Sequence, residues 1–429
     1  MRDGRTEVLV VGAGPVGLWT ALVLAQADIE VCIVDRETRT AARSYACALH
    51  PRTLKFLQDA GLSEAAIALG RKVTKVAFYE GPERKAEIKI DGHGTEFPFL
   101  LILPQSELEK LLEQKLRQTG VSVHWNHRFE NVVEAEDEVT SAIEELGGTA
   151  TGYIVPHWEM VVKHRAQVRS QFLIGADGHG SLVRQRLGVE IMRAGQTERF
   201  AAYEFESAEP ALDEIRIALD STTTNVLWPL GENRCRWTFQ LKEGVPEFPE
   251  KERRAVHLDQ PLIDERLRQF VQKEARKRAP WFSAEVKRVT WCSEVAFERK
   301  LVQPFGRNRC WLLGDAAHQT GPAGVQSMNA GFAEGAALAD KLRPILREDS
   351  PLQILDECNQ IWQAEWKQML GLANQPAAGS QTAAWVVAHA PQLLSCLPAV
   401  ATDFARLAEQ LGLAGTPARG QMQALSGTK

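Results

Sequence analysis

Long apolar stretches are absent from this sequence of 429 residues. None reaches about 18 residues, the length that a helix needs to span a bilayer. Residues 1–7 are polar, and the apolar run 8–11 that follows is too short for the core of a secretion signal. We therefore expect no transmembrane segment and a cytoplasmic protein.

Closely spaced cysteines are also absent. The sequence has 7 cysteines, an odd number, and no two of them form a C-x-x-C pair. Disulfide frameworks and zinc sites rely on cysteines in such regular spacings. We therefore expect free thiols, no bound metal and a reducing environment.

A basic tract is the third absence. Lys and Arg number 50, and Asp and Glu number 55, which gives a formal net charge of −5. Proteins whose main partner is nucleic acid carry a basic patch or stripe, so we expect no nucleic-acid partner here. Hydrophobic residues make up 44% of the chain, which is enough for a sizeable core.

What is present begins with a βαβ unit. The apolar run 8–11 predicts a buried strand that stops at Gly12, and after a helix residues 30–34 predict a second strand. Similar strands that end in glycine are predicted at 172–175 and 309–313. Because these strands come from distant parts of the chain, we predict one cofactor domain that is discontinuous in sequence. A compact N-terminal Rossmann domain would leave the late strand unexplained.

Other segments predict antiparallel sheet and helices. Residues 198–240 alternate apolar and polar, as in a half-solvated antiparallel sheet, and 131–170 predict β-ribbons with a loop at Gly147-Gly148. We therefore predict an α/β fold: a discontinuous Rossmann-like domain, an inserted antiparallel-sheet domain and a C-terminal helical region. Their residues are 1–70, 98–190 and 285–345 for the first, 71–97 and 191–284 for the second, and 346–429, with a disordered tail, for the third.

The first motif is Gly12-Ala13-Gly14-Pro15-Val16-Gly17. Gly12 permits a tight turn, Gly14 lets the backbone approach a pyrophosphate, and Gly17 lets the helix pack on the strand. The N-terminus of that helix would face the phosphates. Asp35 ends the second strand, where a carboxylate accepts hydrogen bonds from an adenosine ribose. The alternative to this dinucleotide site is a glycine-rich turn without a ligand.

Two further motifs follow late strands. Gly314-Asp315-Ala316-Ala317-His318 precedes Pro322, Gly324 and a long helix that starts near Asn329. An Asp after a buried strand can bind a sugar-like hydroxyl, and the helix N-terminus can stabilise negative charge; the alternative is that Asp315 only caps a helix. The segment 175–184, G-A-D-G-H-G-S-L-V-R, would by itself be a turn that leads into a helix.

These three segments, in this order, resemble the group A flavoprotein monooxygenases, the family of p-hydroxybenzoate hydroxylase, over about residues 6–345. The resemblance implies an oxidoreductase with FAD as cofactor, NAD(P)H as reductant and O2 as co-substrate. It would hydroxylate an aromatic or similar electron-rich small molecule through a flavin C4a-hydroperoxide. The Rossmann-like domain would then bind FAD, and the inserted sheet would bind substrate.

The resemblance also implies site residues. The adenosine would lie at 12–36 and the ribityl chain at Asp315. The implied cofactor-binding residues are Gly12, Gly14, Pro15, Val16, Gly17, Asp35, Arg36, Arg43, Gln105, Asp177, Gly314, Asp315, Pro322, Gly324, Ser327, Met328 and Asn329. Two residues depart from the family pattern. Ser327 replaces a usual glycine, where it would crowd the flavin or donate a hydrogen bond to it, and Glu334 replaces a usual Asp.

No side-chain nucleophile is expected, because the cofactor carries the difficult step. The substrate-pocket candidates are His50, Tyr203, Trp228 and Pro322, and the alternative for each is a packed core or loop residue. The substrate would be free or attached to a carrier, and the protein a monomer or homodimer. Residues 376–413 would cover the protein's own core, form a dimer contact or dock on a membrane.

Three other functions fit the scaffold. A flavin-dependent halogenase would carry a W-x-W-x-I-P signature, which this sequence lacks. A prenyl-chain reductase would turn over without consuming O2. A protein that binds FAD without turnover is favoured slightly by Ser327.

Overall fold

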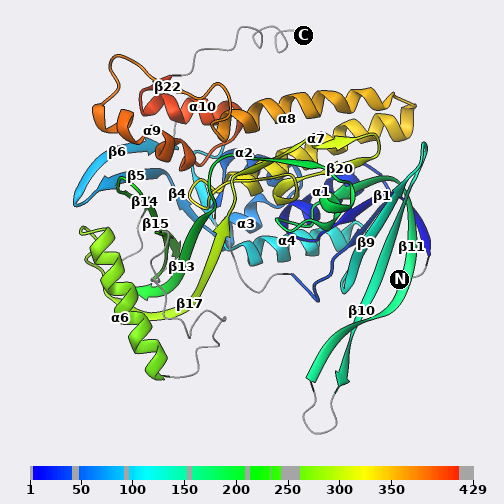
Figure 1. The fold of residues 1–429 in the computed structure, drawn as a ribbon, viewed down its shortest axis with the longest axis horizontal. Helices are drawn as coiled ribbons and strands as arrows, with labels where there is room; N and C mark the ends of the chain where they lie inside the picture. The colour runs from blue at the N-terminus through cyan, green and yellow to red at the C-terminus, as the bar shows by residue number, and fades with distance from the viewer. Residues whose placement is uncertain are drawn as a thin grey trace. The chain divides into compact units, whose positions relative to one another are not determined.

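The computed structural model describes residues 3–40, 48–90, 96–151, 157–207, 213–231, 233–242 and 261–414 (Figure 1). The chain divides into two compact units. The first comprises residues 1–72, 94–196 and 298–363, and the second comprises 73–93, 197–297 and 364–429. Within the described ranges no helix is long and apolar enough to cross a membrane, and no group of three or more His, Cys, Asp or Glu residues could hold a metal ion.

A parallel sheet organises the first unit. Its strand order is β20-β11-β1-β2-β8, and every neighbouring pair is parallel. The strands are β1 (Gly4–Val11), β2 (Val31–Val34), β8 (Val123–His124), β11 (His157–Gly175) and β20 (Cys310–Leu312). The strands predicted at 8–11, 30–34, 172–175 and 309–313 therefore lie side by side. This arrangement confirms the predicted α/β fold with a discontinuous parallel sheet.

Two helices of this unit pack closely against each other. Helix α1 (Pro15–Gln26) follows β1, and α7 (Gln326–Glu348) lies against it. Trp19 of α1 donates a hydrogen bond of 2.8 Å from Nε1 to the carbonyl oxygen of Phe332 and stacks on its ring. A Cβ at Gly335 would lie 2.5 Å from Thr20 Oγ1, so this close approach requires glycine.

A β-ribbon extends the same sheet. Strands β9 (His127–Glu134) and β10 (Val139–Thr151) pair antiparallel, and β10 pairs with the first part of β11. The ribbons predicted in 131–170 are confirmed, but the loop predicted at Gly147-Gly148 is wrong. Both glycines lie inside β10 and pair with Val161 and Met160, because a glycine in a strand interior need not end the strand.

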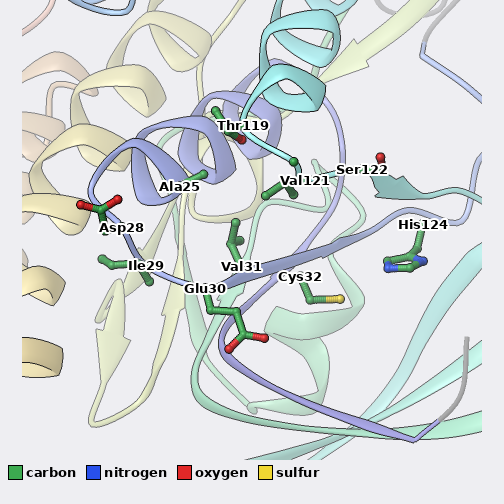
Figure 2. A pocket seen from close by; sticks show the side chains of 11 residues that line it. Ala25, Asp28, Ile29, Glu30, Val31, Cys32, Thr119, Val121, Ser122 and His124 are labelled. Carbon is green, nitrogen blue, oxygen red and sulfur yellow. The ribbon is translucent and has the colours of Figure 1, made fainter.

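A pocket of about 510 Å³ opens beside β2 (Figure 2). Residues 28–32, at the start of β2, line it together with 119–122 and His124. None of the residues predicted for the cofactor or substrate lines this pocket. Burial raises the pKa of its thiol, Cys32, to about 12, so this thiol is protonated at neutral pH.

An antiparallel sheet organises the second unit. Its order is β17-β13-β16-β15-β14-β5-β6, and only the β14–β5 pair is parallel. The strands are β5 (Lys75–Glu80), β6 (Glu83–Lys89), β13 (Glu198–Ser207), β14 (Glu214–Leu219), β15 (Thr224–Gly231), β16 (Arg234–Leu241) and β17 (Val286–Phe297). The alternating segment 198–240 thus spans β13, β14 and β15 and all but the last residue of β16.

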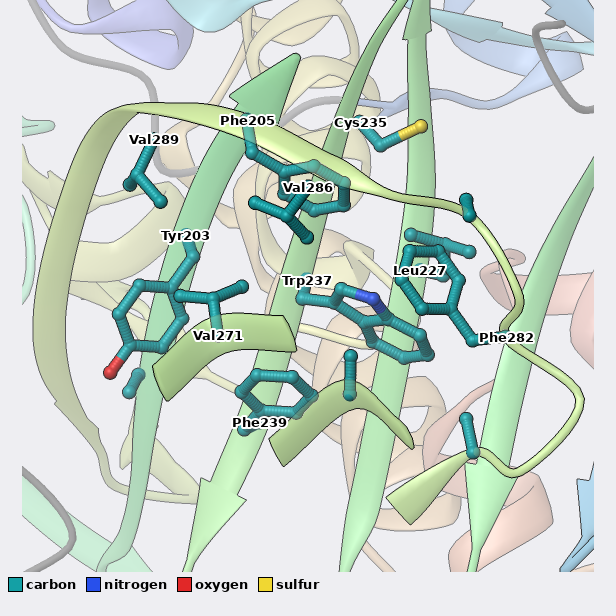
Figure 3. Close-up of a cluster of buried hydrophobic side chains, with 14 of the residues drawn as sticks. Tyr203, Phe205, Leu227, Cys235, Trp237, Phe239, Val271, Phe282, Val286 and Val289 are labelled. Atoms are coloured by element: carbon teal, nitrogen blue, oxygen red, sulfur yellow. The ribbon is translucent and has the colours of Figure 1, made fainter. Parts of the chain in front are cut away.

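One face of this sheet forms a core with helix α6 (Pro261–Arg278) (Figure 3). Tyr203, Trp237 and Phe239 point into it from the strands, and Val271 comes from the helix. Successive strand residues face opposite sides, which is why alternate residues of β13 enter this core.

C-terminal helices pack on the second unit. Gln410, at the end of α10 (Ala401–Gln410), makes hydrogen bonds of 2.9 and 3.0 Å to the backbone of Lys89 in β6. Gln392 of α9 (Ala384–Ser395) donates to the carbonyl oxygen of Asp220. These helices therefore cover their own chain, the first of the three roles considered for 376–413. The predicted disordered tail falls on 415–429, outside the described residues.

The remaining elements are short or connect these layers. They are β3 (Ala48–Leu49), α2 (Pro51–Asp59), α3 (Ser63–Leu69), β4 (Arg71–Val73), β7 (Leu100–Ile102), α4 (Gln105–Gln118), α5 (Leu182–Arg186), β12 (Glu190–Arg193), β18 (Lys300–Gln303), β19 (Gly306–Arg307), the 3-10 helix η2 (Gly314–Ala316), β21 (His318–Gln319), the 3-10 helix η3 (Leu352–Leu355), α8 (Asp356–Met369), β22 (Ala377–Ala378) and β23 (Leu413–Ala414).

Candidate cofactor site

The three motif segments meet at the carboxyl edge of the parallel sheet. Ala176 N–H donates to the carbonyl oxygen of Val11 at 2.7 Å, and Leu313 N–H donates to that of Gly175 at 2.9 Å. The loops after β1, β11 and β20 are therefore adjacent. Ligands of open α/β sheets bind outside the carboxyl ends of the strands, so this edge is the candidate site.

The glycines of the first loop differ in what they allow. Gly12 has φ of +106°, and a Cβ there would overlap the carbonyl oxygen of Ala176. A Cβ at Gly17 would overlap the carbonyl oxygen of Gly12. Nothing lies within 4 Å of a Cβ built at Gly14, which begins α1 without a side-chain cap. The first two glycines thus serve the fold, whereas Gly14 borders open space.

Asp35 reaches back to this loop. Its Oδ2 accepts a 2.5 Å hydrogen bond from the Ala13 N–H, and its Oδ1 accepts one of 2.8 Å from the Glu37 N–H. Asp35 therefore stands beside the turn at the end of β2. Arg36, by contrast, is exposed and forms an ion pair with Glu37. Arg43 lies outside the described residues.

Asp315 presents a carboxylate at the same edge. It is half-buried, and its side chain makes no hydrogen bond or ion pair with any residue that the structure describes. Burial raises the pKa of Asp315, and nearby His318, His179 and Lys300 oppose that rise. Gly314 before it has φ of +57°. A carboxylate in this state is suited to accept hydrogen bonds from a bound hydroxyl, and it does not act as a helix cap.

Asp177 caps the short helix α5. It accepts hydrogen bonds from Ser181 Oγ at 2.5 Å, from Leu182 N–H at 2.7 Å and from Val183 N–H at 3.2 Å. Burial raises the pKa of its carboxyl group. Its oxygens are thus already occupied by the protein, although its backbone lies at the sheet edge.

Arg184 joins the second and third motifs. It is buried, and it donates from Nη1 to the carbonyl oxygen of Ala316 at 2.7 Å and from Nη2 to that of His179 at 2.9 Å. Arg184, the last residue of the segment 175–184, therefore fixes the neighbouring Gly314–His318 segment. Sequence inspection located this residue but did not reveal its partner.

Ser327 closes the loop before α7. Its hydroxyl accepts a 3.1 Å hydrogen bond from the Thr320 N–H. Pro322 and Gly324 lie in the loop thus closed, Met328 is buried on the first turn of α7, and Val325 begins this helix with φ of +48° and no side-chain cap. The departure from glycine is therefore accommodated by a contact within the protein.

His50, at the start of α2, and Asn329, on the first turn of α7, hold the same loop. His50 donates its backbone N–H to Asn329 Oδ1 at 2.8 Å, and its Nε2 lies 3.0 Å from the carbonyl oxygen of Gly324. Asn329 Nδ2 donates to the carbonyl oxygens of Ala48 and Val325. Burial lowers the pKa of His50 to about 4, so its ring is neutral at pH 7 and donates through Nε2.

The other candidates lie elsewhere. Gln105, the first residue of α4, donates to Glu109 at 2.8 Å. Tyr203 lies in the core under α6, whereas Trp228 faces the other side of its sheet, since its neighbour Leu227 points into that core. Burial raises the pKa of Tyr203. A pocket role for Tyr203 therefore has no support, because its ring is enclosed by apolar side chains.

Comparison with known proteins gives a family. A model described as FAD binding domain matches residues 5–371. The chain is 29% identical to a 6-methylpretetramide 4-monooxygenase of Streptomyces rimosus over 82% of this chain and 58% of that one. It is 26% identical to a para-nitrophenol 4-monooxygenase of Pseudomonas sp. (strain WBC-3) over 82% of this chain and 81% of that one. A Bacillus subtilis (strain 168) relative, named as an uncharacterized aromatic compound monooxygenase, is also longer, and this chain spans 64% of it.

Solved structures share the fold. The p-nitrophenol 4-monooxygenase PnpA from Pseudomonas putida DLL-E4 superposes with a TM-score of 0.71 at 21% identity, covering 97% of this chain and 100% of that one. The flavin-dependent monooxygenase PieE, solved with FAD and substrate, gives 0.69 at 21% identity and covers 95% and 69%. With the family match over most of its length, the chain belongs to the FAD binding domain family, among the group A flavoprotein monooxygenases.

Proposed function

We propose that this chain is an FAD-dependent monooxygenase that uses NAD(P)H and O2 to hydroxylate a small aromatic or similarly electron-rich substrate. The observation that carries the proposal is the meeting of three motif segments at one sheet edge around Asp315, whose carboxylate no described residue engages. Relatives named as monooxygenases support the reaction class. Several of these relatives are longer than this chain, and therefore their activity is proposed for this chain and not transferred to it directly.

The residues at the sheet edge fit FAD. Gly14 leaves room for a pyrophosphate at the uncapped start of α1, where backbone N–H groups favour an anion. In this proposal Asp35 would accept hydrogen bonds from the ribose hydroxyls, and Asp315 would accept them from the ribityl hydroxyls. The uncapped start of α7 offers a second set of N–H groups for the negative side of the flavin ring.

Bound FAD would supply the redox chemistry, taking electrons from NAD(P)H and activating O2. The chain itself would bind and orient. His50 and Asn329 would hold the loop at Pro322 and Gly324, and Arg184 would hold the Gly314–His318 segment. We assign cofactor binding to the first unit and substrate binding to the antiparallel sheet of the second. Arg36, Arg43 and Gln105 enter this proposal on sequence resemblance alone.

Ser327 no longer favours a protein that binds FAD without turnover. Ser327 suggested a disturbed flavin pocket, yet its hydroxyl is engaged by Thr320. No contact in the described residues specifically favours a halogenase or a prenyl-chain reductase.

The test begins with the visible spectrum of the purified protein. Oxygen uptake is then followed with NADH and with NADPH across phenols, indoles and quinolones. We expect bound FAD, uptake stimulated by one aromatic class, and a product heavier by one oxygen atom. Bound FAD that NAD(P)H reduces no faster than free flavin, with every aromatic tried, would refute the monooxygenase proposal.

A further inference from the structure

Glu334 on α7 bridges both ends of the Gly314–His318 segment. Its Oε2 accepts a 3.1 Å hydrogen bond from the Gly314 N–H, and its Oε1 lies 2.6 Å from His318 Nε2. Glu334 is 2% exposed and His318 is 0% exposed. A buried carboxylate with charged or polar partners on both oxygens is held in one position. The first and last residues of this segment are therefore fixed to the same side chain.

Asp315 lies between the two bridged residues. It belongs to η2, a single tight turn, so its backbone direction follows from where Gly314 and His318 are held. Arg184 adds a third contact, at the carbonyl oxygen of Ala316. The Asp315 carboxylate itself has no hydrogen-bond partner among the residues described, so its position depends on these backbone ties.

The two carboxylates also interact through their charge. Glu334 is among the groups that act on Asp315, and it disfavours ionisation there. In the opposite sense, Lys300 and the two histidines favour it. Charges in a water-poor site act strongly on one another. Glu334 can therefore influence a ligand at Asp315 by geometry and by electrostatics.

We propose that Glu334, through His318 and Gly314, is a positioning residue for Asp315 that sets both the affinity for FAD and the reduction potential of the bound flavin. This inference rests on the proposed FAD site and deepens it. The family resemblance implies an Asp at this position, and the Glu334 side chain of this protein contacts both Gly314 and His318. His318 is the positioning partner, since it connects the end of the segment to α7.

The test uses full-length protein and two substitutions at the same position. Glu334→Gln keeps the length and an acceptor for Gly314 but removes the charge. Glu334→Met keeps similar bulk and removes both polar contacts. We expect Glu334→Gln to weaken FAD binding, because one of the two polar contacts at the carboxylate changes, and to shift the midpoint potential of bound FAD to a more positive value, because a negative charge near the flavin is lost. We expect Glu334→Met to weaken FAD binding ten-fold or more. Glu348→Gln, an exposed change of the same charge on the last turn of α7, should alter neither quantity.

A double-mutant cycle separates positioning from general stability. Glu334→Gln and Asp315→Asn are made singly and together, and the FAD dissociation constant of each is measured by fluorescence quenching. If Glu334 acts through Asp315, the two effects on affinity are not additive. Additive effects, or a Glu334→Gln protein with wild-type affinity and potential, would overturn the inference while leaving the proposed function standing. Wild-type protein that takes up no FAD would overturn both. The cycle still decides the question if Glu334→Met fails to fold.

Discussion

Single residues at the sheet edge divide into those that shape the protein and those that face a ligand. Gly12 and Gly17 are required by neighbouring carbonyl oxygens, whereas Gly14 borders open space. Asp35 and Asp177 bond to backbone N–H groups, whereas the Asp315 carboxylate bonds to none of the described residues. The motif pattern alone does not make this distinction, because it identifies positions and not their partners.

Gly14→Val and Gly12→Ala test that division. We expect Gly14→Val to fold with wild-type thermal stability but to lose FAD, because its side chain enters the open space that we propose for the pyrophosphate. Gly12→Ala should lower the free energy of unfolding by about 2 kcal/mol or more, through strain and overlap. Thermal unfolding of the apoprotein and FAD titration measure the two effects. Stoichiometric FAD in the purified Gly14→Val protein would count against the site.

His50 predicts a pH dependence of stability. Its pKa is about 4 in the fold and near 6.5 when unfolded, so the unfolded chain binds more protons between these values. The stabilisation is fully present above pH 6.5 and is lost as the pH falls towards 4. At full effect it is on the order of 3 kcal/mol. His50→Gln keeps a donor for Gly324 but cannot titrate in this range. Urea unfolding should show wild type losing its advantage over this variant as the pH falls, and a constant difference from pH 4 to 7 would refute the idea.

At the scale of elements, strand and helix positions could be predicted well. Apolar runs that stop at glycine marked β1, β11 and β20, and the alternation over 198–240 marked β13 to β16. The error at Gly147-Gly148 arose because strand pairing with β11 overrides the local preference of glycine. The parallel pairing of β14 with β5 could not be predicted from local sequence patterns either, because it joins segments that are far apart in the chain. The side of the sheet on which Tyr203 lies could not be predicted either, because it depends on which face α6 covers.

The α1–α7 contact gives a prediction at this scale. A Cβ at Gly335 would lie 2.5 Å from Thr20 Oγ1 and 3.2 Å from Trp19 Cδ1. Gly335→Ala should therefore destabilise the fold by roughly 1–3 kcal/mol, even though alanine is the better helix former. Urea unfolding measures the change, and Asp340→Ala on the exposed face of α7 is the control. A Gly335→Ala protein more stable than wild type would show that α7 can move away.

At the scale of the whole molecule, the C-terminal helices belong to the second unit. Removing everything after Leu370 deletes α9 and α10, with the hydrogen bonds of Gln392 and Gln410 to that unit. We expect the truncated protein to expose apolar surface, to give a lower soluble yield and to unfold at a lower temperature. Truncation after Ala414 keeps both helices and serves as the control. A soluble, fully active protein truncated after Leu370 would refute this expectation.

Each unit is assembled from three stretches of chain, and this has a consequence for biosynthesis. The glycine loop at Gly12 is made long before β20, Asp315 and α7, which follow only after residue 309. A ribosome must therefore translate nearly three hundred further codons before the sheet edge can close. Until then the early βαβ unit lacks the strand and helix that complete the sheet edge, so FAD loading at the proposed site would have to follow the synthesis of α7.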